Sequence, residues 1–162
     1  MTPTEDYIQV LSHLKCGALG LLRAHAGQEL DQTLDAFDLF AGLWWPLRQR
    51  NRNAPRRQVA WLIAKLYAHR PLTHSCGRTL ASQLRRCQPQ RPDQATAFQK
   101  RFDAMLVLPV AQMESPLHWV LAQLHASNLP LDWVALTNDL SFWDDSIRIR
   151  WAEDFLNTQG GR

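Results

Sequence analysis

The residues of this chain best suited to bind a ligand are arginines, and most of them lie in its middle third. Residues 48 to 101 contain thirteen lysines and arginines and a single acidic residue, Asp93. Fifteen of the eighteen basic residues of the chain are arginines. A planar guanidinium group forms paired hydrogen bonds to phosphate oxygens, which an ammonium group cannot do. The pattern therefore indicates binding to a phosphate backbone.

The two flanks carry the opposite charge. Residues 1 to 47 contain two basic and six acidic residues, and residues 102 to 162 contain three basic and eight acidic residues. The formal net charge is only +3, so this value conceals a strongly positive central segment. Concentrated positive charge attracts polyanions more strongly than the same charges spread evenly.

The arginines occur on several expected elements. Residues 47 to 55 alternate arginine with amide side chains and are expected to form an exposed loop. Arg56 and Arg57 follow in the first turn of the next expected helix, where the helix dipole already concentrates positive charge. A bound phosphate would remove this conflict; the alternative is that both side chains simply point into solvent. The predicted nucleic-acid contacts are Arg23, Arg48, Arg50, Arg52, Arg56, Arg57, Arg78, Arg85, Arg86, Lys100 and Arg101.

Signatures of other chemistry are not found in the sequence. It has no Gly-rich phosphate loop, no Gly-x-Ser-x-Gly and no His-Glu-x-x-His. The only conceivable metal ligands, His69, His74, Cys76 and Cys87, match no zinc spacing. We therefore expect no metal ion, no cofactor and no enzymatic activity. Trp45 is a candidate for stacking on a base, whereas Trp44 falls on an apolar helical face.

The elements that position these residues are expected to be helices, because apolar residues recur at spacings of three and four. Helices are expected from about Thr4, from Ala18 to about His25, from Leu34 to a stop at Pro46, from Pro55 to Tyr67, from Arg78 to Cys87, from a cap at Asp93 to about Leu108, from a cap at Ser115 to about Ser127, and from caps at Asp132 and Asp144. No strand pattern or repeat is present. The predicted fold is an all-α compact bundle of about eight helices.

The length of 162 residues is enough for one domain with its own core. We expect a single domain, 1–162, with a possible N-terminal subdomain 1–90 and a C-terminal helical bundle 93–157. The odd number and wide spacing of Cys16, Cys76 and Cys87 argue against a disulfide framework, so these residues are expected to be small buried apolar groups in a reducing compartment. No apolar run approaches the roughly 18 residues of a membrane span, and the acidic N-terminus does not resemble a secretory signal. A cytoplasmic location, with no membrane partner, is expected.

The sequence also resembles a known family, the small subunit of the type I-E CRISPR Cascade complex, or CasB family. The most specific matches are Leu131-Asp132-Trp133 through Asp139-Leu140 to Trp143, and Arg150-Trp151-Ala152-Glu153-Asp154-Phe155. Further matches, in the order of the family, are Gly17-Ala18 to Leu22-Arg23, Val59-Ala60-Trp61-Leu62-Ile63-Ala64, Gly77-Arg78-Thr79-Leu80-Ala81 and Arg101-Phe102-Asp103-Ala104-Met105-Leu106. The resemblance covers about Leu14 to Phe155.

What this resemblance implies is a non-catalytic all-α protein of antiviral defence, present as two copies in a guide-RNA surveillance complex. The implied partners are the guide RNA, the target and displaced DNA strands, the Cascade backbone subunits, the large subunit and the second copy. By position, the family's nucleic-acid contacts correspond to Arg23, to Arg56 or Arg57, to Arg78 and to Arg101. The second arginine of the family's Leu-Arg-Arg segment is Ala24 in this chain, and alanine has no group that could replace the contact of that arginine.

Two other functions are compatible with the sequence. A free-standing helical DNA-binding regulator would insert one helix into the major groove and would bind selectively. A scaffold would use its acidic flanks and tryptophans to dock protein partners, with the basic segment incidental. The scatter of arginines over several elements favours contacts to a nucleic-acid backbone without sequence specificity.

Overall fold

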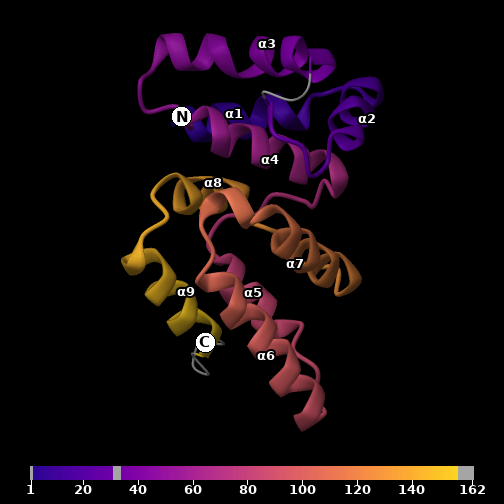
Figure 1. Cartoon of the computed structure of the whole chain (residues 1–162), viewed down its shortest axis with the longest axis vertical. Coiled ribbons are helices and arrows are strands. Elements are labelled where there is room, and N and C mark those ends of the chain that lie inside the picture. The colour runs from indigo at the N-terminus through magenta and orange to yellow at the C-terminus, as the bar shows by residue number, and fades with distance from the viewer. Residues whose placement is uncertain (1, 31–33, 157–162) are drawn as a thin grey trace. The chain divides into compact units, whose positions relative to one another are not determined.

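The computed structural model describes residues 2–30 and 34–156. Within these ranges the chain forms nine α-helices, and its only β-type pairing is an isolated bridge between His74 and Leu131 (Figure 1). The predicted all-α fold is confirmed, with one helix more than the approximate number expected.

The chain divides into two compact units, Met1–Pro71 and Leu72–Arg162, which are named unit 1 and unit 2. This division lies earlier than the predicted boundary between 90 and 93. The reason is that the helix Leu80–Arg86 contacts two later helices of unit 2. That the whole chain, 1–162, acts as a single domain stays a prediction.

Unit 1 contains α1 (Pro3–Ser12), α2 (Cys16–Ala24), α3 (Leu34–Arg50) and α4 (Arg57–His69). Helices α2 and α3 contact α4, and α1 contacts α3 (Figure 1). Nine of the thirteen residues of α4 are buried. Two polar side chains of α4, Trp61 and Lys65, both donate to the main-chain oxygen of Gln28, at 2.9 and 2.7 Å. This shared acceptor ties the segment after α2 to α4.

Helix α3 continues through Pro46 to Arg50, so the predicted stop at Pro46 and the predicted loop over residues 47 to 55 are wrong in part. A proline inside a helix removes one hydrogen bond and usually ends or kinks the helix. Here the turn beyond the proline is retained by packing, because Leu47 is buried. The Asn51 N–H also donates to the Leu47 carbonyl at 3.0 Å. The connecting loop is therefore only residues 51 to 56.

Unit 2 contains α5 (Leu80–Arg86), α6 (Pro92–Leu106), η2 (Val110–Gln112), α7 (Glu114–Ala126), α8 (Trp133–Ser141) and α9 (Asp145–Leu156) (Figure 1). Helix α5 contacts α7 and α9, and α6 contacts α9. The Phe155 ring of α9 stacks on Phe102 and Phe98 of α6, with ring centroids 4.4 and 6.2 Å apart. Trp133 and Trp151 are fully buried. Aromatic packing therefore holds this unit together.

The predicted caps of the last two helices are confirmed. Asp132 Oδ1 accepts the Ala135 N–H at 3.0 Å at the start of α8. Asp144 accepts the hydroxyl of Ser146 and the N–H three residues on, and these bonds, the Ser146 bond first, lower the pKa of the Asp144 carboxyl. The caps predicted at Asp93 and Ser115 are wrong, because each is the second residue of its helix. The proline before Asp93 already has the backbone angle of a first helical residue.

The cysteines differ from their predicted environment. All three are free thiols, and Cys16 and Cys76 are exposed rather than buried. Only Cys87 is half-buried, and burial raises the pKa of its thiol. None of the described helices is long and apolar enough to cross a membrane.

Candidate nucleic-acid interface

Five of the predicted contact residues lie at one corner of unit 1, where α3 ends and α4 begins. They are Arg48, Arg50, Arg52, Arg56 and Arg57. This α3–α4 corner, residues 48–57, contains no acidic residue. Arg48 and Arg50 belong to the last turn of α3 rather than to a loop as predicted. The continuation of α3 beyond Pro46 therefore sets the positions of both side chains.

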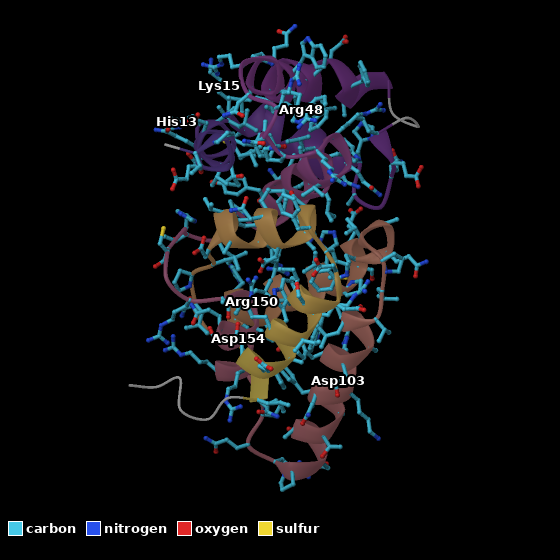
Figure 2. All side chains as sticks on the ribbon, turned by 90° about the vertical axis from the view of Figure 1, so that its left-hand side faces the viewer. His13, Lys15, Arg48, Asp103, Arg150 and Asp154 are labelled. Atoms are coloured by element: carbon cyan, nitrogen blue, oxygen red, sulfur yellow. The ribbon has the colours of Figure 1, made fainter. Side chains whose placement is uncertain are left out.

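Arg48 organises the loop that follows it. Its Nη1 group donates to the main-chain oxygens of Arg52 and Ala54, at 2.6 and 2.8 Å, and the side chain is half-buried. Figure 2 shows Arg48 on α3. The two carbonyl acceptors bind its Nη1 group without neutralising its charge, so Arg48 both shapes the corner and adds to its positive potential.

Arg52, Arg56 and Arg57 are exposed in the loop and at the start of α4. Arg56 is the N-cap of α4, where no side chain accepts a hydrogen bond from the first turn and where no acidic residue is present. Main-chain N–H groups at the start of a helix have no partner within that helix. A phosphate would accept hydrogen bonds from these groups and would pair with the guanidinium groups beside them.

Trp45 lies one turn before Arg48 on α3 and is 51% exposed. The neighbouring Trp44 is held in place, because its ring stacks on Phe40 and its Nε1 donates to the Pro55 oxygen at 2.6 Å. The expected difference between the two tryptophans is confirmed. Stacking of a base on Trp45 stays a prediction.

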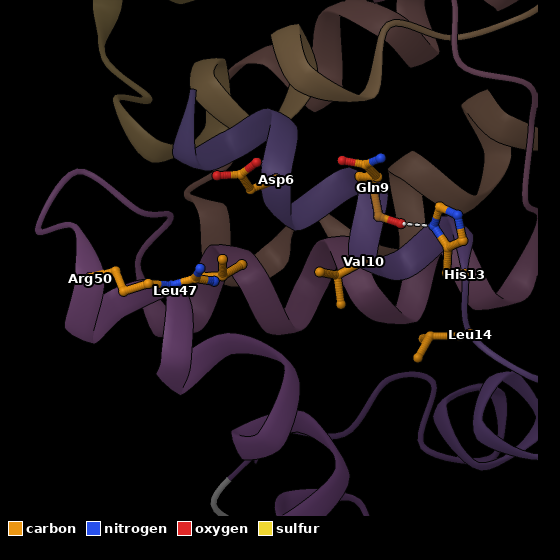
Figure 3. Close-up of a pocket in the computed structure, with 7 residues that line it drawn as sticks. All are labelled: Asp6, Gln9, Val10, His13, Leu14, Leu47 and Arg50. Atoms are coloured by element: carbon orange, nitrogen blue, oxygen red, sulfur yellow. Dashed lines mark hydrogen bonds between the residues drawn. The ribbon is translucent and has the colours of Figure 1, made fainter. Parts of the chain in front are cut away.

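Arg50 lines a pocket of about 530 Å³ between α1 and α3, shown in Figure 3. Its other lining residues include the apolar Val10, Leu14 and Leu47 and the acidic Asp6. The Nε group of Arg50 is 3.4 Å from the Pro46 oxygen. The mixture of apolar and charged lining residues makes this pocket less suited to a phosphate backbone than the α3–α4 corner.

Two further predicted arginines, Arg23 and Arg78, are exposed. Arg23 lies in the last turn of α2, with its Nε 3.5 Å from the Leu19 oxygen. Arg78, which the sequence places on a helix, instead precedes α5, because the side chain of Thr79 caps that helix by accepting the Ser82 N–H at 3.2 Å. Arg78 is therefore a loop residue.

Arg85 has a structural contact in unit 2. Its Nη1 donates to the Phe155 oxygen in the last turn of α9, and the side chain is half-buried. This bond joins α5 to α9, so Arg85 is less available to a ligand than the prediction assumed. Arg86 is exposed and donates to the side chain of Gln83 at 3.2 Å.

Lys100 and Arg101 are exposed on α6. The guanidinium carbon of Arg101 lies 4.7 Å from the centre of the Trp119 ring. A cation over an aromatic face is attracted to the ring. Arg101 is thus oriented before any ligand binds. Asp103, on the same helix (Figure 2), is exposed as well.

Several arginines outside the predicted set are paired with acids. Arg91 pairs with Asp93 at 3.6 Å, Arg148 pairs with Asp145 at 3.2 Å, and Arg150 pairs with Asp139. Hydrogen bonding to Asp139 also raises the pKa of Arg150. At the α3–α4 corner, by contrast, the four arginines other than Arg57 form no ion pair with any acid among the described residues. The corner therefore carries four guanidinium groups, of Arg48, Arg50, Arg52 and Arg56, that no acid among the described residues neutralises.

The comparisons with known proteins agree with this structure. Residues 18–156 match the model of the family described as CRISPR-associated protein Cse2. None of the curated protein sequences compared with the chain matches it. A Cse2-family protein from Thermus thermophilus has a similar structure, with a TM-score of 0.73, 23% identity, and coverage of 96% of this chain and 98% of that chain.

Two further solved structures share the fold. CasB from M. ruber matches with a TM-score of 0.74 and 19% identity, covering 95% of this chain and 92% of that one. CasB from Thermobifida fusca matches with a TM-score of 0.65 and 19% identity, covering 94% of this chain and 97% of that one. Nearly the whole chain is aligned in each case, so the similarity extends over both units.

Proposed function

The chain belongs to the Cse2 family of CRISPR-associated proteins, and from this we propose that it is a non-catalytic small subunit of a guide-RNA-directed Cascade complex. In this role it binds the nucleic-acid backbone without sequence specificity and stabilises both target binding and the displaced DNA strand. Its partners in the proposal are the guide RNA, the DNA strands, the backbone and large subunits, and a second copy of the chain.

The observation that supports the proposal most directly is the α3–α4 corner. Five arginines lie within ten consecutive residues that contain no acid. Three of them are exposed around the uncapped N-terminus of α4. Charge of this kind contacts phosphates, which lie at every nucleotide, and does not by itself distinguish bases.

The division of labour in a guide-RNA complex explains why no base contacts are needed. Base pairing between guide and target supplies the sequence specificity, and the protein binds the backbone and recognises its shape. Once the target strand pairs with the guide, the displaced strand competes to re-anneal. Phosphate contacts to that strand oppose re-annealing, and the stability of the open state rises.

Exposed basic residues of unit 2 are proposed to form additional contacts to the nucleic-acid backbone. Arg78 and Arg101 correspond by position to contacts in the family, and Lys100 adjoins Arg101 on α6. Arg85 should contribute less to binding, because its Nη1 group already donates to the Phe155 oxygen. We expect Arg78 and Arg101 to contribute more to binding than Arg85.

The test is filter binding of the purified full chain to several unrelated single-stranded and double-stranded DNA sequences. The proposal requires weak binding that is similar for all sequences and that decreases with salt. Selective binding of one duplex sequence would instead support a DNA-binding regulator. The absence of any binding at low salt would support a protein-docking scaffold, and either result would overturn the proposed role.

A further inference from the structure

Three side chains of unit 2 with metal-binding groups lie together, although their spacing along the chain matches no metal-binding pattern. They are His74, Cys76 and Asp132, and their potential ligand atoms all lie within 4.8 Å of one another. The Nε2 atom of His74 is 3.4 Å from Sγ of Cys76. Asp132 follows Cys76 by 56 residues in the chain, so its proximity is a product of the fold. His69 and Cys87, which the sequence analysis also considered, do not belong to this group.

The main chain holds the two segments that carry these residues together. His74 and Leu131 form a parallel β-bridge, with the Ser75 N–H donating to the Leu131 oxygen at 3.1 Å. The Gly77 N–H donates to Asp132 Oδ2 at 3.3 Å, and the other carboxylate oxygen caps α8. These hydrogen bonds hold the three side chains close together without a metal ion. Binding of an ion would therefore cost less conformational entropy than at a site that has to be ordered by the ion.

Thiolate, imidazole and carboxylate ligands are the three types that Zn²⁺ prefers. For tetrahedral zinc, with Zn–N of about 2.0–2.1 Å and Zn–S of about 2.3 Å, the nitrogen and sulfur atoms are about 3.5 Å apart. The separation of 3.4 Å between His74 and Cys76 agrees with this value. We propose that His74, Cys76 and Asp132 form a binding site for Zn²⁺, with water in the fourth position.

The hydrogen bonding of His74 limits the affinity of this site. The Trp133 N–H donates to Nδ1 at 3.2 Å, so in the neutral ring the proton is on Nε2, facing the sulfur atom of Cys76. An ion bound at Nε2 moves this proton to Nδ1 and displaces the bond from Trp133. Because of this exchange, and because only three side chains bind the ion, we expect weaker binding than at a structural zinc site with four protein ligands.

The bound ion would fix the segment that precedes α5. Gly77, directly after Cys76, has a φ of 103°, which a glycine adopts without strain, and Arg78 comes next. An ion joining residues 74 and 76 to the N-terminus of α8 would therefore restrict the loop that carries Arg78. The metal site itself does not depend on nucleic-acid binding by the chain.

Cobalt titration of the purified full chain, free of any histidine tag, tests the site. Co²⁺ replaces Zn²⁺ in tetrahedral sites, and its bond to a thiolate gives a charge-transfer absorption band. We expect one Co²⁺ per chain at micromolar concentration, displacement by Zn²⁺, and loss of the band in Cys76→Ser. His74→Ala and Asp132→Asn should weaken binding at least tenfold; asparagine retains the helix cap.

Cys16→Ser is the matched control, because Cys16 is also an exposed thiol but is not part of the group. It should bind cobalt as the unmodified chain does. Circular dichroism should show the same helix content in all four variants. The proposal is overturned if the unmodified chain shows no saturable band, or if the band persists in Cys76→Ser, or if it is lost in Cys16→Ser.

Discussion

Reversing the two charges at the start of α4 should change binding and stability in opposite directions. Arg56 is the N-cap of α4 and Arg57 is its first residue. In Arg56→Glu/Arg57→Glu, acidic side chains replace basic ones at the positive end of the helix dipole. Each charge at a helix end contributes about 0.3–1 kcal/mol. We therefore expect the free energy of unfolding to rise by about 1 kcal/mol, which corresponds to about 2–4 °C in Tm for a chain of this size.

Binding of single-stranded DNA by the same variant should become weaker. Each phosphate contact contributes about 0.7 to the slope of log affinity against log salt. The loss of two contacts should reduce this slope by about 1.4 and reduce the affinity by about 25-fold at 0.1 M salt. The assay is a filter-binding titration at several salt concentrations, with a thermal melt of the same samples. In an assembled complex, the variant should also weaken stable strand separation.

Lys15→Glu/Arg91→Glu is the matched control. It changes the net charge by the same amount, Lys15 is the N-cap of α2, and both residues are exposed. Neither belongs to the predicted set of contacts. This control should gain some stability at α2 and should retain most of its affinity. Equal binding losses in the two double variants would show that net charge alone controls binding. An unchanged salt slope in the α4 variant would refute the proposed phosphate contacts.

Three other substitutions test the structural assignments. Arg48→Ala removes two hydrogen bonds to loop carbonyls and should lower the free energy of unfolding by about 1–3 kcal/mol. In the same denaturant titration, Arg52→Ala should leave the free energy of unfolding unchanged. Burial raises the pKa of the Tyr7 hydroxyl, so the unfolded chain loses this proton at a lower pH than the folded chain does. The free energy of unfolding should therefore fall as pH rises above about 10. In Tyr7→Phe, the decrease of Tm with pH in this range should be smaller. Asp139→Asn weakens the bonds from Trp151 and Arg150 and should lower Tm by several degrees; an equal loss in the exposed Asp145→Asn would contradict this assignment.

Features that depend on neighbours in the chain could be predicted from the sequence. The helical class follows from apolar spacing, and the caps at Asp132 and Asp144 follow from the residues that begin α8 and α9. The segregation of charge and the resemblance to the family are also visible in the sequence, and the family comparison confirms the membership. Helical spacing and helix caps have causes that act within a few residues, and charge segregation is a property of the sequence itself, so none of these features requires knowledge of the tertiary contacts.

Features that depend on distant residues were decided by the tertiary structure. Helix α3 passes Pro46 because Leu47 is buried, and Arg85 is bonded because the end of α9 lies against α5. Asp132 approaches His74 and Cys76 because a β-bridge joins their segments. Charge and side-chain type define what an arginine, histidine or cysteine can bind. Packing determines which acceptors and ligands lie within its reach, and therefore which of these residues remain available for function.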